Sequence, residues 1–133
     1  MALSEEHIEE IAGLLDCGLV CFYHKITKSI EYHPDSEEFY SVPEPWHDIL
    51  DKIQADRNNY IRFEKMDSNQ AFRVMENFAW SLTDIDFRDQ ILARLSKRKP
   101  FQHFKFLIDS SEYRQDWFDF KKKAYIEWVK EQI

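Results

Sequence analysis

The chain has 133 residues, of which 44% are hydrophobic and 16% aromatic, and its formal net charge is −7 at pH 7. This length fits one domain with a small core, and the apolar content excludes a natively disordered chain. No apolar run is long enough to cross a bilayer, and residues 1–10 lack the basic and apolar regions of a secretory signal, so we expect a cytoplasmic protein.

Charge is distributed unevenly along the chain. Residues 1–66 contain 14 acidic and 6 basic residues, whereas residues 67–133 contain 11 acidic and 12 basic residues. The acidic balance disfavours nucleic-acid or membrane binding by the whole surface, but it allows a local cationic patch. Two cysteines, Cys17 and Cys21, are too few for a disulfide framework.

The first segment with a clear pattern is a helix between Ser4 and Gly18. Serine suits the N-cap, and glycine suits the left-handed residue that ends many helices. The inward face recurs at helical spacing and consists of Ile8, Ile11, Ala12 and Leu15.

A small antiparallel sheet is predicted next. Residues 19–24 and 29–33 are rich in β-branched and aromatic side chains, and the short connection over 25–28 makes them a hairpin. Residues 60–64 alternate between apolar and polar side chains, as a half-buried third strand does.

Between the hairpin and the third strand we expect a loop and a helix. Residues 34–45 are acidic, contain prolines and have no periodicity, which is typical of a surface loop. Pro45 suits the start of a helix, and apolar residues at helical spacing continue the pattern until about Asp56.

The C-terminal half contains the patterns of four helices. Asp67 with Gln70 resembles a capping box for the first, and Thr83 with Asp86 resembles one for the second, which reaches about Ser96.

The last two helices follow a proline and a pair of serines. Pro100 suits the first turn of a helix, because its missing N–H has no helical acceptor there. Ser110 or Ser111 then caps a final helix whose apolar stripe includes Trp117 and Phe120.

This order of elements predicts an α+β fold. We expect a small three-stranded antiparallel sheet, made of the hairpin and one further strand, packed against a helical, mainly C-terminal subdomain. Each half alone has too little core, so we expect a single domain over residues 1–133, with an acidic helix and hairpin part at about 1–66 and a four-helix part at about 67–133.

A cationic stretch lies where the second and third C-terminal helices meet. Between Asp89 and Asp109 the chain has no acidic residue, but it contains five basic ones, namely Arg94, Lys97, Arg98, Lys99 and Lys105. In the helix that follows, Phe101, Phe104 and Ile108 recur at helical spacing, so we expect all three on an inward apolar face.

Two interpretations of Lys97, Arg98 and Lys99 are open. At the end of the preceding helix, cations complement the helix dipole and its unpaired carbonyl groups. The same residues also precede the N-terminus of the next helix, whose free N–H groups favour an anion. The second interpretation predicts a phosphate or carboxylate site, and both can hold at once.

Several short motifs together point to a family. The chain contains, in this order, LDCG at 15–18, YI at 60–61, MENF at 75–78, KPFQHFK at 99–105, and Trp117 with Phe120. With these motifs the chain resembles number 158 of the UPF (uncharacterised protein family) series. The resemblance implies a small stand-alone bacterial protein and brings no assigned activity, cofactor or catalytic residue. Members usually carry arginine at the positions of Gln102 and His103, so the resemblance implies a thinner cationic patch here.

A zinc site is one alternative use of the polar residues. Cys17, Cys21, His24 and His33 are of the types that zinc prefers. Their spacing fits neither a zinc ribbon nor a finger, and Cys21 and His24 would point to opposite faces of one strand. We therefore expect buried, inert thiols and no metal.

Catalysis is a second alternative. Glu76 borders the apolar face of its helix and Asp16 lies just before Gly18, and a carboxylate beside a low-dielectric wall can act as an acid or base. The sequence contains no nucleophile elbow, phosphate loop, HExxH motif or kinase signature. A small enzyme of hydrolase type that uses Glu76 or Asp16 is therefore the alternative, not the leading interpretation.

The sequence favours a non-enzymatic binding or adaptor domain that needs no cofactor. It would recognise an acidic protein segment or a small anionic ligand through a basic patch at the helix junction, with Trp80 and Trp117 as apolar anchors. A weak nucleic-acid binder is a further alternative, because bases can stack on rings set among cations, but the acidic balance disfavours it. The sequence does not fix the oligomeric state. The expected binding residues are Lys97, Arg98, Lys99, His103, Lys105, Trp80 and Trp117.

Overall fold

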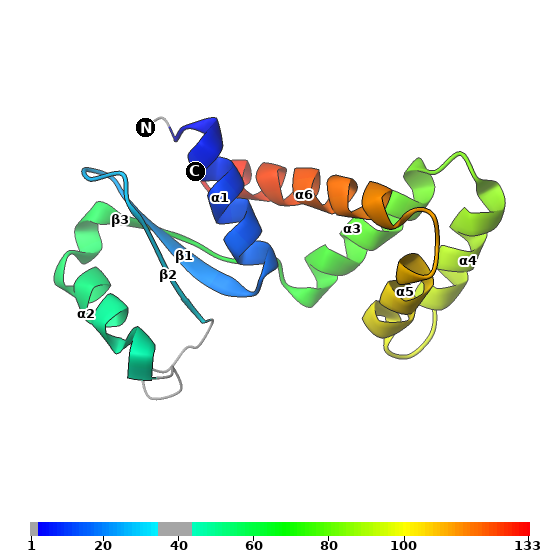
Figure 1. Cartoon of the computed structure of the whole chain (residues 1–133), viewed down its shortest axis with the longest axis horizontal. Coiled ribbons are helices and arrows are strands. Elements are labelled where there is room, and N and C mark those ends of the chain that lie inside the picture. Colours follow the sequence, from blue (N-terminus) through cyan, green and yellow to red (C-terminus); the bar gives the residue numbers. More distant parts are fainter. Residues whose placement is uncertain (1–2, 35–43) are drawn as a thin grey trace. The chain divides into compact units, whose positions relative to one another are not determined.

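The computed structural model describes residues 3–34 and 44–133 of the chain. This part contains six α-helices and a three-stranded antiparallel sheet, which confirms the predicted α+β class (Figure 1). The chain divides into two compact units: unit 1 comprises Met1–Lys65 and Tyr125–Ile133, and unit 2 comprises Met66–Ala124.

Unit 1 begins with helix α1 (Glu5–Asp16), whose limits follow the predicted signals. The Ser4 side chain accepts a hydrogen bond from the N–H of His7, as an N-cap does. The four residues of the predicted inward face, Ile8, Ile11, Ala12 and Leu15, are all buried. Gly18 then has φ 88°, a left-handed conformation that glycine adopts without steric cost.

The sheet of unit 1 consists of β1 (Leu19–His24), β2 (Ile30–Pro34) and β3 (Tyr60–Phe63) in the order β2-β1-β3. Both neighbours of the central strand β1 are antiparallel to it, and Cys21 lies opposite both Tyr32 and Phe63. The sheet is therefore the predicted hairpin with a third strand added at the β1 edge.

Helices α1 and α2 (His47–Ala55) pack on opposite faces of the sheet, as Figure 1 shows. On one face, Val20 and Phe22 pack against Ile53 of α2. Tyr23 points to the other face, where its ring lies 5.3 Å from the ring of His7 in α1. This arrangement follows from the alternation of side chains along β1.

Most of the predicted loop over 34–45 lies outside the described residues, since these omit 35–43. Pro34 belongs to β2, and Glu44–Trp46 forms a 3₁₀ turn (η2) that leads into α2. Pro45 therefore precedes the α-helix instead of opening it. A second 3₁₀ turn, Arg57–Asn59 (η3), connects α2 to β3.

The end of β3 is bound to the last turns of helix α6 (Arg114–Glu131) within unit 1. The backbone N–H of Glu64 donates to Gln132 Oε1 at 2.9 Å, and the carbonyl of Glu64 accepts from Gln132 Nε2 at 3.1 Å. Trp128 Nε1 donates to the same carbonyl at 2.7 Å. These bonds satisfy backbone groups that follow the last strand of the sheet.

Unit 2 contains α3 (Ser68–Ser81), α4 (Ile85–Leu95), α5 (Pro100–Asp109) and the first half of α6. The capping box of Asp67 and Gln70 is confirmed, with both reciprocal hydrogen bonds present.

The predicted cap of α4 is wrong by one residue. Asp84, not Thr83, is the N-cap, and its carboxylate accepts from the N–H of Phe87 at 3.0 Å. The other oxygen of Asp84 accepts from the Tyr113 hydroxyl at 2.7 Å, so a tertiary contact holds the carboxylate of the true cap.

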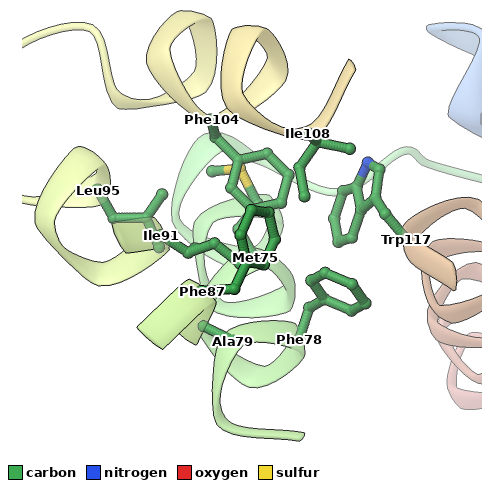
Figure 2. Packing of buried hydrophobic residues seen from close by; sticks show 9 residues of the cluster. All are labelled: Met75, Phe78, Ala79, Phe87, Ile91, Leu95, Phe104, Ile108 and Trp117. Atoms are coloured by element: carbon green, nitrogen blue, oxygen red, sulfur yellow. The ribbon is translucent and has the colours of Figure 1, made fainter. Parts of the chain in front are cut away.

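The core of unit 2 is a single cluster of apolar side chains, shown in Figure 2. It joins α3, α4, α5 and the first turn of α6, and its buried members are Met75, Phe78, Ala79, Phe87, Ile91, Leu95, Phe104, Ile108 and Trp117. Phe104 and Ile108 confirm the predicted inward face of α5. Phe101 does not belong to it, because 43% of its surface is exposed.

No helix within the described ranges is both long and apolar enough to span a membrane.

Candidate functional site

The cationic stretch forms an exposed turn between α4 and α5, here called the basic turn and defined as Lys97, Arg98 and Lys99. Helix α4 ends at Leu95, where Ser96 Oγ donates to the carbonyl of Ala93 and so satisfies one of the last helical acceptors. The chain then reverses, and Lys99 adopts φ 54° and ψ 55°.

The left-handed conformation of Lys99 sets the start of α5. A residue with a Cβ atom rarely adopts positive φ, because the Cβ crowds the following carbonyl. Pro100 follows as the first helical residue, with its φ already fixed at a helical value. The strained residue and the proline together place the three cations of the basic turn at the N-terminal end of α5.

Helix α5 begins without a side-chain cap. The first backbone bond into the helix runs from the N–H of His103 to the carbonyl of Lys99 at 3.2 Å. Pro100 has no N–H, so the N–H groups of Phe101 and Gln102 are the ones left without a helical acceptor. These donors and the helix dipole give the N-terminus of α5 a partial positive charge next to the basic turn.

Lys105 and His103 lie further along α5. Lys105 is exposed, whereas His103 is half-buried. Within the residues that the structure describes, Lys97, Arg98, Lys99 and Lys105 form no ion pair with a carboxylate. The ion pairs of unit 2 instead involve Arg88 with Asp89 and Arg114 with Asp109. Among the described residues, the cations of the basic turn are therefore exposed and without an ion-pair partner.

The two tryptophans proposed as anchors differ in accessibility. Trp117 is only 9% exposed, and its ring packs edge-on against the rings of Phe78 and Phe104 at 5.3 and 4.7 Å. It therefore belongs to the core and is not an exposed anchor.

Trp80 is 62% exposed, and the guanidinium of Arg88 lies over its ring at 4.9 Å. Arg88 is in the first turns of α4, and a rise of about 1.5 Å per residue places it roughly 10 Å along the helix axis from Leu95, beyond which the basic turn begins. The structure therefore does not bring Trp80 together with the basic turn.

The two acid–base candidates lie in different units. Glu76 is half-buried beside Met75 on α3 of unit 2, and Asp16 is exposed at the last residue of α1 in unit 1. Burial raises the pKa of Tyr125, and the charge of Asp16 raises it further.

The four residues considered for zinc do not lie together, because some are on different faces of the sheet and Cys17 is at the end of α1. Cys21 is buried as predicted, but the prediction of a buried thiol is wrong for Cys17, which is exposed at the end of α1. His33 Nδ1 donates to the carbonyl of Pro34 at 2.7 Å. The described residues contain no group of three or more His, Cys, Asp or Glu side chains that could hold a metal ion.

A polar network around His24 was missed by the sequence analysis. His24 Nε2 lies 2.6 Å from Asp56 Oδ2, and Asn59 Nδ2 donates to the other oxygen of Asp56 at 2.6 Å. The His24 ring also contacts the edge of Tyr60. The only signal in the sequence was the i,i+3 spacing of Asp56 and Asn59 in the connection before β3, which favours a local turn and does not point to His24.

Comparison with known proteins bears on the identity of the chain. No curated protein matches it, and no solved structure does. The model of one protein family matches residues 38–133, which include the basic turn and all of α5. The chain therefore belongs to the Uncharacterised protein family (UPF0158), as its short motifs predicted.

Proposed function

We propose that the chain is a non-enzymatic cytosolic binding domain that recognises an acidic segment of another protein through the basic turn. The observation that supports the proposal most directly is that Lys97, Arg98 and Lys99 are exposed on consecutive positions and form no ion pair with a described carboxylate. Three exposed cations beside the positive end of a helix form a surface that attracts carboxylates.

The charge of the surrounding unit also supports the proposal. Unit 2 contains 9 acidic and 11 basic residues, although the whole chain has a net charge of −7. Because the chain as a whole is acidic, it repels a long polyanion at long range, whereas a short acidic segment can place its few charges on the cationic site alone. A short acidic segment fits this pattern better than a nucleic acid does.

The test is a titration of a fluorescently labelled, glutamate-rich peptide against the whole chain, followed by anisotropy. Replacement of Lys97, Arg98 and Lys99 by alanine should weaken binding by roughly 3- to 150-fold, since exposed ion pairs contribute roughly 0.2–1 kcal/mol each. Alanine and lysine both carry a Cβ, so the substitution at position 99 leaves the left-handed backbone as unfavourable as before.

A matched control removes three charges elsewhere in unit 2. Arg73 of α3 and Lys122 and Lys123 of α6 are exposed cations, and their replacement by alanine changes the net charge by the same amount. We expect this variant to keep most of the affinity. Equal losses in both variants would show that only the overall charge matters, and no loss in the basic-turn variant would remove the proposed site.

A further inference from the structure

Helix α5 exposes two phenylalanine rings, one next to the basic turn and one about 7.5 Å further along the helix axis. Phe101 is 43% exposed and Phe106 is 72% exposed, which makes Phe106 the most exposed large hydrophobic side chain of the described residues. Phe104 and Ile108 of the same helix are buried in the unit 2 core; Phe106 lies on the opposite face from them, and Phe101 lies at the border of their face. The sequence pattern of α5 therefore supplies more apolar surface than the core of unit 2 uses.

The two rings flank a polar arc of α5. At about 100° per residue, Phe101 and Phe106 are roughly 140° apart around α5, and Lys105 and Gln102 occupy the arc between them. Phe101 follows Lys99 by two residues, so the first of the two rings lies directly after the basic turn. We call this surface, made of Phe101, Lys105 and Phe106, the α5 strip.

We propose that the acidic segment recognised by the basic turn also carries apolar side chains, aromatic or long aliphatic, which pack on the α5 strip. This inference rests on the proposed function and names the chemistry of the partner more narrowly. Carboxylates would face Lys97, Arg98, Lys99 and Lys105, while the apolar groups would cover Phe101 and Phe106 and remove both rings from water. Exposed aromatic residues flanked by charge are typical centres of such interfaces.

The charge distribution of the chain favours this partner over a nucleic acid and over a second copy of the chain. A single-stranded nucleic acid would stack its bases on the rings, but its phosphates would meet an acidic chain. A second copy of this chain would bury the rings in a dimer, but each copy would bring the same basic turn to the contact and place like charges together. A segment that carries both acidic and apolar side chains complements the cations and the exposed rings of this surface.

The test compares two peptides of equal length and equal negative charge. One alternates glutamate with leucine and phenylalanine, and the other has serine at every apolar position. We expect the apolar peptide to bind the whole chain at least about tenfold more tightly than the serine peptide. Phe101→Ala with Phe106→Ala should abolish this preference and leave the affinity for the serine peptide unchanged. Both rings are exposed, so the double variant should fold, which circular dichroism checks.

Phe118→Ala is the matched control, because Phe118 is an exposed phenylalanine on α6 of the same unit. This variant should retain the preference for the apolar peptide. A preference that persists without Phe101 and Phe106, or one that is absent from the native chain, would overturn the inference.

The design separates this inference from the proposed function. If both peptides bind equally and both lose affinity in the basic-turn variant, the proposed function stands and the inference about apolar groups fails. If neither peptide depends on the basic turn, the proposed function itself fails. Tighter binding of an oligonucleotide of equal charge, or a dimer that dissociates in the Phe101 and Phe106 variant, would also overturn the inference.

Discussion

The buried side chain of His24 pairs with the partly exposed carboxylate of Asp56, and both nitrogens of the histidine ring are hydrogen-bonded. Nε2 lies 2.6 Å from Asp56 Oδ2, and Nδ1 lies 3.2 and 3.0 Å from the backbone nitrogens of Ile26 and Thr27. Backbone N–H groups can only donate, so Nδ1 accepts and Nε2 carries the proton. The ring thus connects the tip of the β1–β2 hairpin to the turn before β3, and it has no nitrogen left for catalysis.

The first prediction concerns the protonation of this ring. At neutral pH the ¹⁵N chemical shifts of His24 should show a protonated Nε2 and an unprotonated Nδ1. The N–H groups of Ile26 and Thr27 both donate to Nδ1, so their amide protons should exchange slowly with solvent. A spectrum with the proton on Nδ1 at neutral pH would contradict the assignment.

The second prediction concerns Asp84 and Tyr113 in unit 2. The pKa of Asp84 is lowered by the hydrogen bond from the N–H of Phe87 and then by the Tyr113 hydroxyl, while the bond to Asp84 raises the pKa of Tyr113 to about 12. A carboxyl group whose pKa is lower in the folded chain than in the unfolded chain stabilises the fold at pH values above its unfolded pKa of about 3.9. This stabilisation is lost as the pH falls through the pKa of the folded chain. Acid should therefore weaken the start of α4.

Tyr113→Phe tests this linkage, because it removes the hydroxyl and leaves the ring to stack on Phe87. The variant should be less stable than the native chain at neutral pH, and the difference in Tm should shrink in acid as Asp84 gains its proton. Asp84→Asn is the control, since asparagine keeps the cap but does not titrate. A difference in Tm that stays constant from neutral pH into acid would contradict the prediction.

Local signals predicted much of this fold, and tertiary contacts explain what they missed. The capping box of Asp67 was readable because both of its partners lie within four residues. The N-cap of α4 could not be read in this way, because Thr83 and Asp84 are both good N-caps and the sequence spacing favoured Thr83. Phe101 lies about 60° around α5 from Phe104, a position at the border of an apolar face where spacing alone does not decide burial.

The polar residues of the candidate site also include some that the sequence predicted and some that it did not. The charges of the basic turn were readable from composition, because nearby acids are absent from that stretch. The pairing of His24 with Asp56 joins positions 32 residues apart and depends on how β3 aligns with β1. No local pattern reports that alignment, so the network became visible only in the fold.

The third prediction concerns the two thiols. Burial raises the pKa of Cys21 to about 12, with a smaller contribution from the charge of Glu10, whereas Cys17 is exposed. The thiolate is the reactive form, so a disulfide reagent at mildly alkaline pH should modify one thiol quickly in the folded chain and both in denaturant. Cys17→Ser should abolish the fast phase and Cys21→Ser should leave it. Fast modification of both thiols in the folded chain would contradict the buried position of Cys21.

The fourth prediction compares two phenylalanines three positions apart on α5. Phe104 is buried against Trp117, so Phe104→Ala should lower the free energy of unfolding by about 3–5 kcal/mol through lost burial and the cavity that remains. Phe101 is partly exposed, and Phe101→Ala should change stability by only about 0.5 kcal/mol. Urea unfolding followed by tryptophan fluorescence measures both. A loss at Phe101 as large as that at Phe104 would place its ring in the core and remove it from the α5 strip.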